Sequence, residues 1–159
     1  MSKVLVCYVS PFDATAQIAM AIAEQLCRYG YYVDLRPVRR VGSVQHYCGV
    51  VVGGALSEAE WNPDAVELLH RCTSDTQRSV WLYHTGFGSG RTARGQLPPD
   101  VVGVAERVGP GFVAVLGDDD LAAVRRWATM IARYLDAADL AAGTDLAPPL
   151  AAVAATAAR

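Results

Sequence analysis

The amino-acid sequence predicts one α/β domain with a doubly wound, five-stranded parallel sheet and helices on both faces, in three α/β/α layers. The chain has 159 residues, of which 52% are hydrophobic and 19% are charged. These proportions are typical of a single globular domain and argue against a disordered chain. Five short apolar segments alternate with segments whose apolar residues recur at helical spacing. Several strand-like segments are continuous apolar runs, as in parallel strands buried on both faces.

The first half of the chain predicts three strands and one helix. Residues 4–9 are all apolar and predict a buried strand. Apolar residues then recur at helical spacing over residues 18–26, and Gly30 is placed to end that helix. The alternating residues 31–35 predict a second strand, and the apolar run at residues 50–52 predicts a third.

The second half predicts two strands and three helices. The Asn-Pro-Asp sequence at residues 62–64 marks a helix start, because Asn is a favoured N-cap, Pro fits the first helical position and an acid is favourable beside the positive end of the helix dipole. Residues 79–85 and 112–116 predict the fourth and fifth strands. A short helix is expected over residues 101–108, and a last helix over residues 121–135.

Composition and spacing also limit the location and partners of the chain. We expect a domain over residues 1–137 and a flexible tail over residues 138–159, because nine of the last nineteen residues are alanine. The first apolar run is too short for a signal peptide, and no segment reaches the roughly 18–20 apolar residues of a membrane span. A cytoplasmic location is therefore expected. A net charge of −2 does not favour nucleic acid as a partner.

The cysteines and histidines do not have the spacing of a metal site. The four cysteines form no C-x-x-C pair, and the three histidines lack paired spacing. Buried free thiols and the absence of a protein metal site are therefore expected. Ligands of doubly wound sheets bind outside the carboxyl ends of the strands. The loops expected there cover residues 10–15, 53–61, 85–91 and 117–120.

Four segments of the chain match a known family: KVLV at residues 3–6, TAQIA at 15–19, GVVVGGAL at 49–56 and RRWA at 125–128. In these segments the chain resembles the flavodoxin-like family, most closely the single-domain flavodoxin proteins related to the flavodoxin-type protoporphyrinogen dehydrogenases. The resemblance covers roughly residues 3–136. It implies a sheet of order 2-1-3-4-5, an FMN cofactor, and a small oxidoreductase acting on a quinone-like or porphyrinogen-like partner. A homodimer is compatible with it.

The first loop departs from the phosphate loop of the family, whose usual form is T-x-T-G-x-T. Here the loop is Ser10-Pro11-Phe12-Asp13-Ala14-Thr15. The resemblance implies that Ser10, Phe12 and Thr15 bind FMN, although the two hydroxyls are equally compatible with ordinary loop positions. Pro11 has no amide to donate. Asp13 is either a helix N-cap or a catalytic carboxylate, and facing a phosphate at about 4 Å it would cost on the order of 4 kcal/mol.

The second loop is implied to lie along one face of the flavin. Gly54 and Ala55 would line this face, and Trp61 offers a ring that stacks on it. The alternative for Trp61 is a hydrophobic staple that packs on Val66 ahead of the helix. Glu58 is either a solvated side chain or an acid or base of the site.

The third loop is rich in glycine and follows the fourth strand. The residues implied to approach a ligand there are Thr85, Gly86, Phe87, Gly88 and Arg91. Glycines allow the backbone to lie close to a ligand, Phe87 would cover a planar ring, and Arg91 would neutralise a phosphate or carboxylate.

The candidate catalytic residues are Asp13, Glu58 and His84. His84 lies near a strand end and is either a structural histidine or a proton donor. A second interpretation of these loops is that the chain has a flavodoxin fold that has lost FMN. It would then use the same edge for flavin-independent catalysis, or to bind another small molecule or a protein partner.

Overall fold

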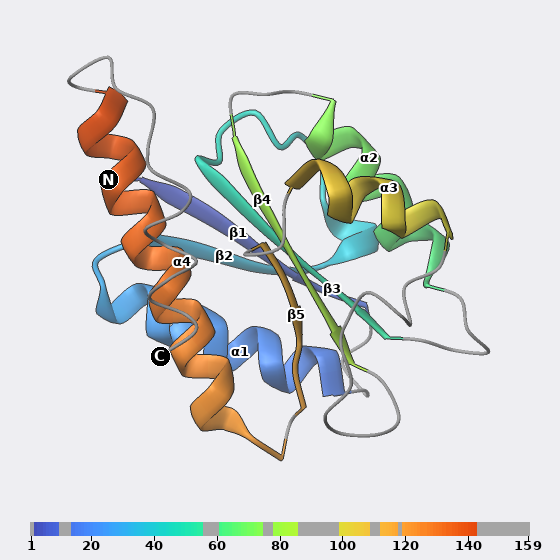
Figure 1. The fold of residues 1–159 in the computed structure, drawn as a ribbon, viewed down its shortest axis with the longest axis horizontal. Helices are drawn as coiled ribbons and strands as arrows, with labels where there is room; N and C mark the ends of the chain where they lie inside the picture. The colour runs from blue at the N-terminus through green and yellow to red at the C-terminus, as the bar shows by residue number, and fades with distance from the viewer. Residues whose placement is uncertain are drawn as a thin grey trace.

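The chain forms a five-stranded parallel sheet between two layers of helices (Figure 1). The computed structural model describes residues 2–9, 14–55, 61–74, 78–85, 99–108, 112–117 and 119–142. Its strands are β1 (Lys3–Tyr8), β2 (Tyr32–Pro37), β3 (Gly49–Ala55), β4 (Ser79–Thr85) and β5 (Val113–Val115). Its helices are α1 (Ala14–Arg28), α2 (Pro63–Thr73), α3 (Pro99–Val108) and α4 (Leu121–Ala142), with a short 3-10 turn η1 (Val38–Arg40).

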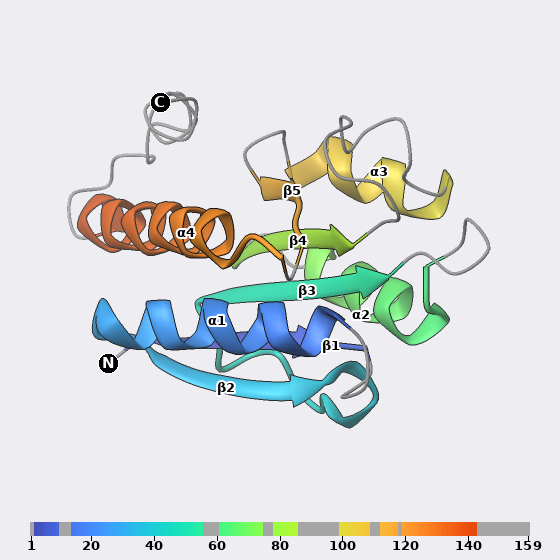
Figure 2. The same ribbon diagram turned by 90° about the horizontal axis from the view of Figure 1, so that it is seen from below.

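The sheet has the order β2-β1-β3-β4-β5, and its paired strands are parallel. This confirms the predicted fold class and strand order. Because β1 lies between β2 and β3, the direction of winding reverses there, which is the point where doubly wound sheets bind ligands. The carboxyl ends of all five strands lie at one edge, which we call the carboxyl edge (Figure 2).

Two hydrophobic cores fill the space between the sheet and its helices. One lies under α1 and α4 and includes Val4, Val6 and Val51. The other lies under α2 and α3 and includes Leu5 and Val50. Successive strand residues point to opposite faces, so each central strand supplies both cores. This explains why these strands are continuous apolar runs.

The helix ends follow the chemistry expected from the sequence. The Asn62 side chain accepts a hydrogen bond from the Asp64 amide at 2.9 Å, which confirms the predicted N-cap of α2. Gly30 follows α1 with a φ of 89°, a conformation that favours glycine. Helix α4 continues to Ala142, past residue 137, where we expected the domain to end. Residues 143–159 lie outside the described part, so the flexible tail stays a prediction.

The four cysteines are free thiols, as expected, but they are not all buried. Cys7 and Cys72 are buried, Cys48 is half-buried and Cys27 is exposed. Cys27 lies in the last turn of α1. In the described ranges, no helix combines the length and apolarity needed to cross a membrane.

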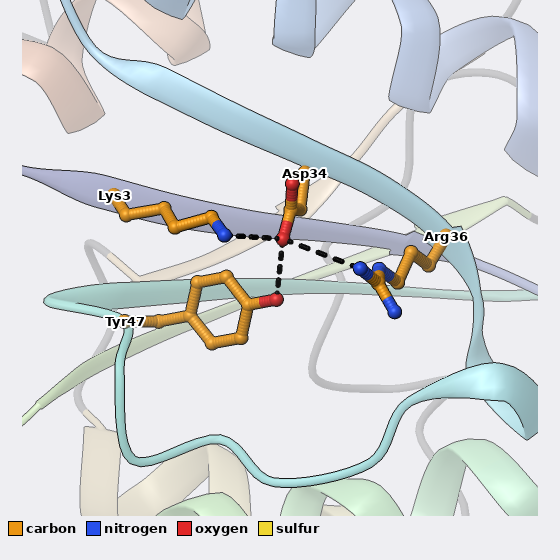
Figure 3. Close-up of polar contacts among 4 residues, drawn as sticks. All are labelled: Lys3, Asp34, Arg36 and Tyr47. Atoms are coloured by element: carbon orange, nitrogen blue, oxygen red, sulfur yellow. Dashed lines mark hydrogen bonds and ion pairs between the residues drawn. The ribbon is translucent and has the colours of Figure 1, made fainter.

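A polar cluster ties the connection before β3 to the first two strands (Figure 3). Asp34 Oδ2 accepts a hydrogen bond from the Tyr47 hydroxyl at 2.6 Å. The same oxygen lies 3.0 Å from Lys3 Nζ and 3.6 Å from Arg36 Nη2. The Tyr47 hydrogen bond, followed by the two cations, holds the pKa of Asp34 below its ordinary value. Burial, with the Asp34 carboxylate, raises the pKa of Tyr47 to about 12.

Tyr31 fastens α4 to the turn between α1 and β2. Its hydroxyl donates to the Asp136 carboxylate and lies 3.3 Å from the Ala132 carbonyl. Burial, together with Asp136, raises the pKa of Tyr31. These contacts hold α4 beside α1, and both helices cover the same face of the sheet.

Candidate functional site

The junction between β1 and α1 places a helix N-terminus at the carboxyl edge. Helix α1 begins at Ala14, shortly after β1 ends at Tyr8. Its first turn carries no acidic residue. The free amides and the dipole of such an N-terminus attract an anion. The junction is therefore suited to a phosphate or carboxylate group.

Thr15 lies in the first turn of α1 and is fully buried. Its Oγ1 accepts a hydrogen bond from the Val9 amide at 3.3 Å. The hydroxyl therefore lies at the N-terminus of the helix, between the end of β1 and the first turn.

A tyrosine that the sequence analysis did not single out fixes this junction. The Tyr83 hydroxyl donates to the Thr15 carbonyl at 2.8 Å and lies 3.3 Å from the Cys7 carbonyl. Tyr83 belongs to β4, so its ring must cross β3 to reach α1. It crosses at Gly53, where an added Cβ would lie 2.1 Å from Tyr83 Cζ. A glycine inside an apolar strand was the sequence signal for this crossing.

The opposite face of the same edge holds Trp61 and His84. Gly54 and His84 are paired in register, and the indole of Trp61 lies against Gly54, where an added Cβ would be 2.5 Å from the ring. The Trp61 and His84 rings stack with centroids 6.2 Å apart and an interplanar angle of 20°. Trp61 is 4% exposed and His84 is fully buried. Among the described residues, Trp61 Nε1 has no hydrogen-bond partner.

Trp61 therefore packs into the core under α2 and α3. Val66, the expected staple partner, packs against the same core. The contacts with Gly54 and His84 were not foreseen, because they depend on the register of β3 and β4. Stacking of Trp61 on a flavin stays a prediction.

The structure brings part of the predicted site together at the carboxyl edge. Thr15, Gly54, Ala55, Trp61, His84 and Thr85 are there, and Ala55 pairs with Thr85 where β3 and β4 end. The other predicted residues lie outside the described part of the chain: Ser10, Phe12, Asp13, Glu58, Gly86, Phe87, Gly88 and Arg91. Their roles stay predictions.

The described residues fit the phosphate end of FMN. A helix N-terminus without acids in its first turn and a buried hydroxyl lie together where β1 ends. The indole Nε1 of Trp61 is a buried donor on the opposite face of the same edge, under α2 and α3. In the ranges that the structure covers, no group of three or more His, Cys, Asp or Glu side chains is arranged to hold a metal ion.

A shallow groove of about 450 Å³ lies away from this edge, along α1 and β2. Its lining residues are Met20, Ala23, Glu24, Cys27, Arg28, Val33 and Leu35. The lining is mostly apolar, and none of the predicted site residues belongs to it. The groove is therefore not the candidate site.

Solved structures with the same fold are mostly flavoproteins by name. Rubredoxin:oxygen oxidoreductase from Desulfovibrio gigas superposes with a TM-score of 0.65 at 19% identity, over 86% of this chain and 37% of that one. An archaeal flavodoxin superposes with a TM-score of 0.59 at 14% identity, over 86% of this chain and 99% of that one. A flavodoxin mutant from Fusobacterium nucleatum, bound to flavin mononucleotide, superposes with a TM-score of 0.50 at 16% identity, over 73% of this chain and 68% of that one.

These likenesses show that the chain has the flavodoxin-like fold. The chain spans little more than a third of the rubredoxin:oxygen oxidoreductase chain, but nearly all of the archaeal flavodoxin. No protein-family model matches the sequence, and no curated protein matches it.

Proposed function

We propose that this chain binds FMN at the carboxyl edge of its sheet and works as a small redox protein. The observation that carries the proposal is the β1–α1 junction, where the N-terminus of α1 and the buried Thr15 hydroxyl lie together. The flavodoxin-like fold supports it, and one neighbour of this fold holds flavin mononucleotide. When bound, FMN supplies the electron-transfer chemistry.

The residues of the chain would then hold and orient the cofactor. The amides of the first turn of α1 would face the phosphate, and the Thr15 side chain would help to hold that turn beside the end of β1. Tyr83 would keep the turn in place through the Thr15 carbonyl. A quinone-like or porphyrinogen-like partner, a cytoplasmic location and a homodimer belong to the same proposal, and each rests on the sequence alone.

An absorbance scan of the purified protein from about 300 to 550 nm tests the proposal. The scan is repeated after FMN is added and the excess is removed. Retention of a flavin band near about 450 nm is the expected result. If no band is retained even at high FMN, the FMN proposal fails.

Two residues of the first loop favour a second function. Pro11 has no amide, and Asp13 carries a carboxylate where the family has glycine. On this interpretation the fold has lost FMN, and the carboxyl edge serves flavin-independent catalysis or binds another ligand, with Asp13, Glu58 and His84 as its candidate catalytic residues.

Replacing Asp13 by glycine separates the two functions. If the carboxylate repels the phosphate, Asp13→Gly tightens FMN binding by up to about three orders of magnitude, the equivalent of about 4 kcal/mol. Flavin fluorescence titration of wild type and variant measures the change. If Asp13 only caps α1, FMN binding stays the same and stability falls by a few tenths of a kcal/mol.

A further inference from the structure

Arginines gather where the edge strand β2 ends. The Arg36 side chain is 49% exposed, and Arg39 and Arg40 are exposed in η1. We call these three residues the β2-end arginine cluster. Tyr8 pairs with Pro37 in register, so η1 follows directly beside the point where β1 leads to the candidate site. Figure 2 shows η1 at the end of the β2 arrow.

Among the described residues, Asp34 pairs with only one member of this cluster, Arg36. Residues 28–48 contain four arginines and one aspartate, in a chain whose net charge is −2. That aspartate, Asp34, already contacts Lys3 and Tyr47 besides Arg36. Across the described ranges, neither Arg39 nor Arg40 pairs with a carboxylate. The positive charge at the β2 end is therefore available to a partner.

The opposite end of the carboxyl edge carries two exposed aspartates, which precede the exposed Arg125 and Arg126 of α4. Asp119 and Asp120 follow β5 and are exposed, and the preceding Leu116 amide donates to the His84 carbonyl at 3.0 Å. The four spacings between the five strands, about 4.8 Å each, separate the two ends by roughly 19 Å, which exceeds the Debye length of about 8 Å at physiological salt. The edge therefore presents the β2-end arginine cluster and these aspartates at separate ends, with the candidate site between them.

We propose that the β2-end arginine cluster is the docking surface for an acidic electron-transfer protein. This inference rests on the proposed function. Complementary charge steers such a partner and fixes its orientation. The aspartates near β5 would repel the partner's acidic face, so the partner would dock over β2 and β1, beside the candidate site. A nucleic acid would need a longer positive track than three arginines.

Titration of the isotope-labelled full chain with an acidic plant-type ferredoxin tests the inference by NMR. We expect shifts of the amide signals of Arg36 and of residues 38–41, and we expect the affinity to fall as salt rises. The double variant Arg39→Glu/Arg40→Glu should weaken binding by about tenfold or more at low salt. The matched control, Arg126→Glu/Arg133→Glu on α4, has the same charge change and should retain more of the binding.

The design keeps folding and flavin binding separate from docking. Signal dispersion reports whether each variant is folded, and the neutral pair Arg39→Gln/Arg40→Gln should weaken binding less than the charge reversal does. Because the titration needs no flavin, docking without a retained flavin band supports this surface and overturns the proposed function. Equal weakening in the α4 control overturns the inference, as does tighter binding of basic cytochrome c or of a single-stranded oligonucleotide.

Discussion

At the scale of single residues, Gly53 and Tyr83 show how a side chain from one strand can organise a distant helix. The sequence marks Gly53 only as an interruption of an apolar run. The structure places it within β3, under the ring of Tyr83. The sequence could not reveal this contact, because it depends on the register of β3 with β4 and on the position of α1. Residue type alone predicted the N-cap Asn62, because a cap is a local feature.

Replacing Gly53 by alanine should destabilise the protein. The new Cβ would lie 2.1 Å from Tyr83 Cζ and 2.2 Å from its hydroxyl, so the tyrosine must leave its hydrogen bonds. Overpacking of this kind costs about 1–3 kcal/mol. Urea unfolding measures the loss. Gly103→Ala is the control, because an added Cβ there meets no atom within 4 Å. Equal stability of the Gly53 variant and wild type would contradict the packing described.

Replacing Thr15 by valine should weaken FMN binding, because it removes the hydroxyl that accepts from the Val9 amide and holds the turn where the phosphate would bind. Flavin fluorescence titration measures this loss. Thr73→Val is the matched control, because Thr73 bonds to the Leu69 carbonyl within α2. An unchanged affinity in Thr15→Val would remove Thr15 from the site.

At the scale of elements, the sequence predicted each strand and helix but not the contacts between them. Continuous apolar runs and helical spacing are local signals, and they located β1 to β5 and α1 to α4. Between the strands predicted at residues 31–35 and 50–52, the structure adds the short turn η1. The polar cluster of Figure 3 was not foreseen, because Lys3, Asp34 and Tyr47 come from three separate segments. Only the pairing of β1 with β2 brings them together.

The polar cluster should make stability depend on pH. The pKa of Asp34 is lowered in the folded protein, so its contribution is present above its unfolded pKa of about 3.9 and is lost as pH falls through the folded value. The pKa of Tyr47 is raised to about 12, so its contribution is present below about pH 10 and is lost as pH rises towards 12. The cluster should therefore stabilise the fold between these limits.

Asp34→Asn tests this at the acidic limit. At pH 7 the variant should lose about 1–3 kcal/mol of unfolding free energy, because the hydrogen bond and the cations lose their charged partner. The difference from wild type should shrink as pH falls below about 4, where Asp34 becomes protonated. Denaturant titration at several pH values measures both. Glu106→Gln, at an exposed position of α3, is the matched control for the loss of one carboxylate charge. A constant difference across the range would exclude the titration of Asp34 as its cause.

At the scale of the whole molecule, strand order rather than any one motif locates the site. The reversal of winding between β1 and β3 brings the ends of β1, β3 and β4 to one edge, as the sequence predicted. The same order places β2 and β5 at opposite sides, which separates the arginines of the β2 end from the aspartates that follow β5. Composition could not predict that the arginines and the aspartates lie on opposite sides of the sheet, because the net charge of −2 is a sum over the whole chain.

Binding of FMN should stabilise the whole fold, and its phosphate should be needed for the full effect. A ligand that binds only the folded state adds about 2.7 kcal/mol at a concentration 100 times its Kd. The site combines the N-terminus of α1 with Thr15, so riboflavin, which has the same ring but no phosphate, should raise the melting temperature less than FMN at the same concentration. Differential scanning fluorimetry of unlabelled protein compares the two, with inorganic phosphate as a control for the phosphate alone. Equal stabilisation by riboflavin and FMN would show that the phosphate does not contribute to binding. The β1–α1 junction would then not be the phosphate site, and only the flavin ring would be bound. A shift with phosphate alone would show that the junction holds an anion without a flavin, as the second proposed function allows.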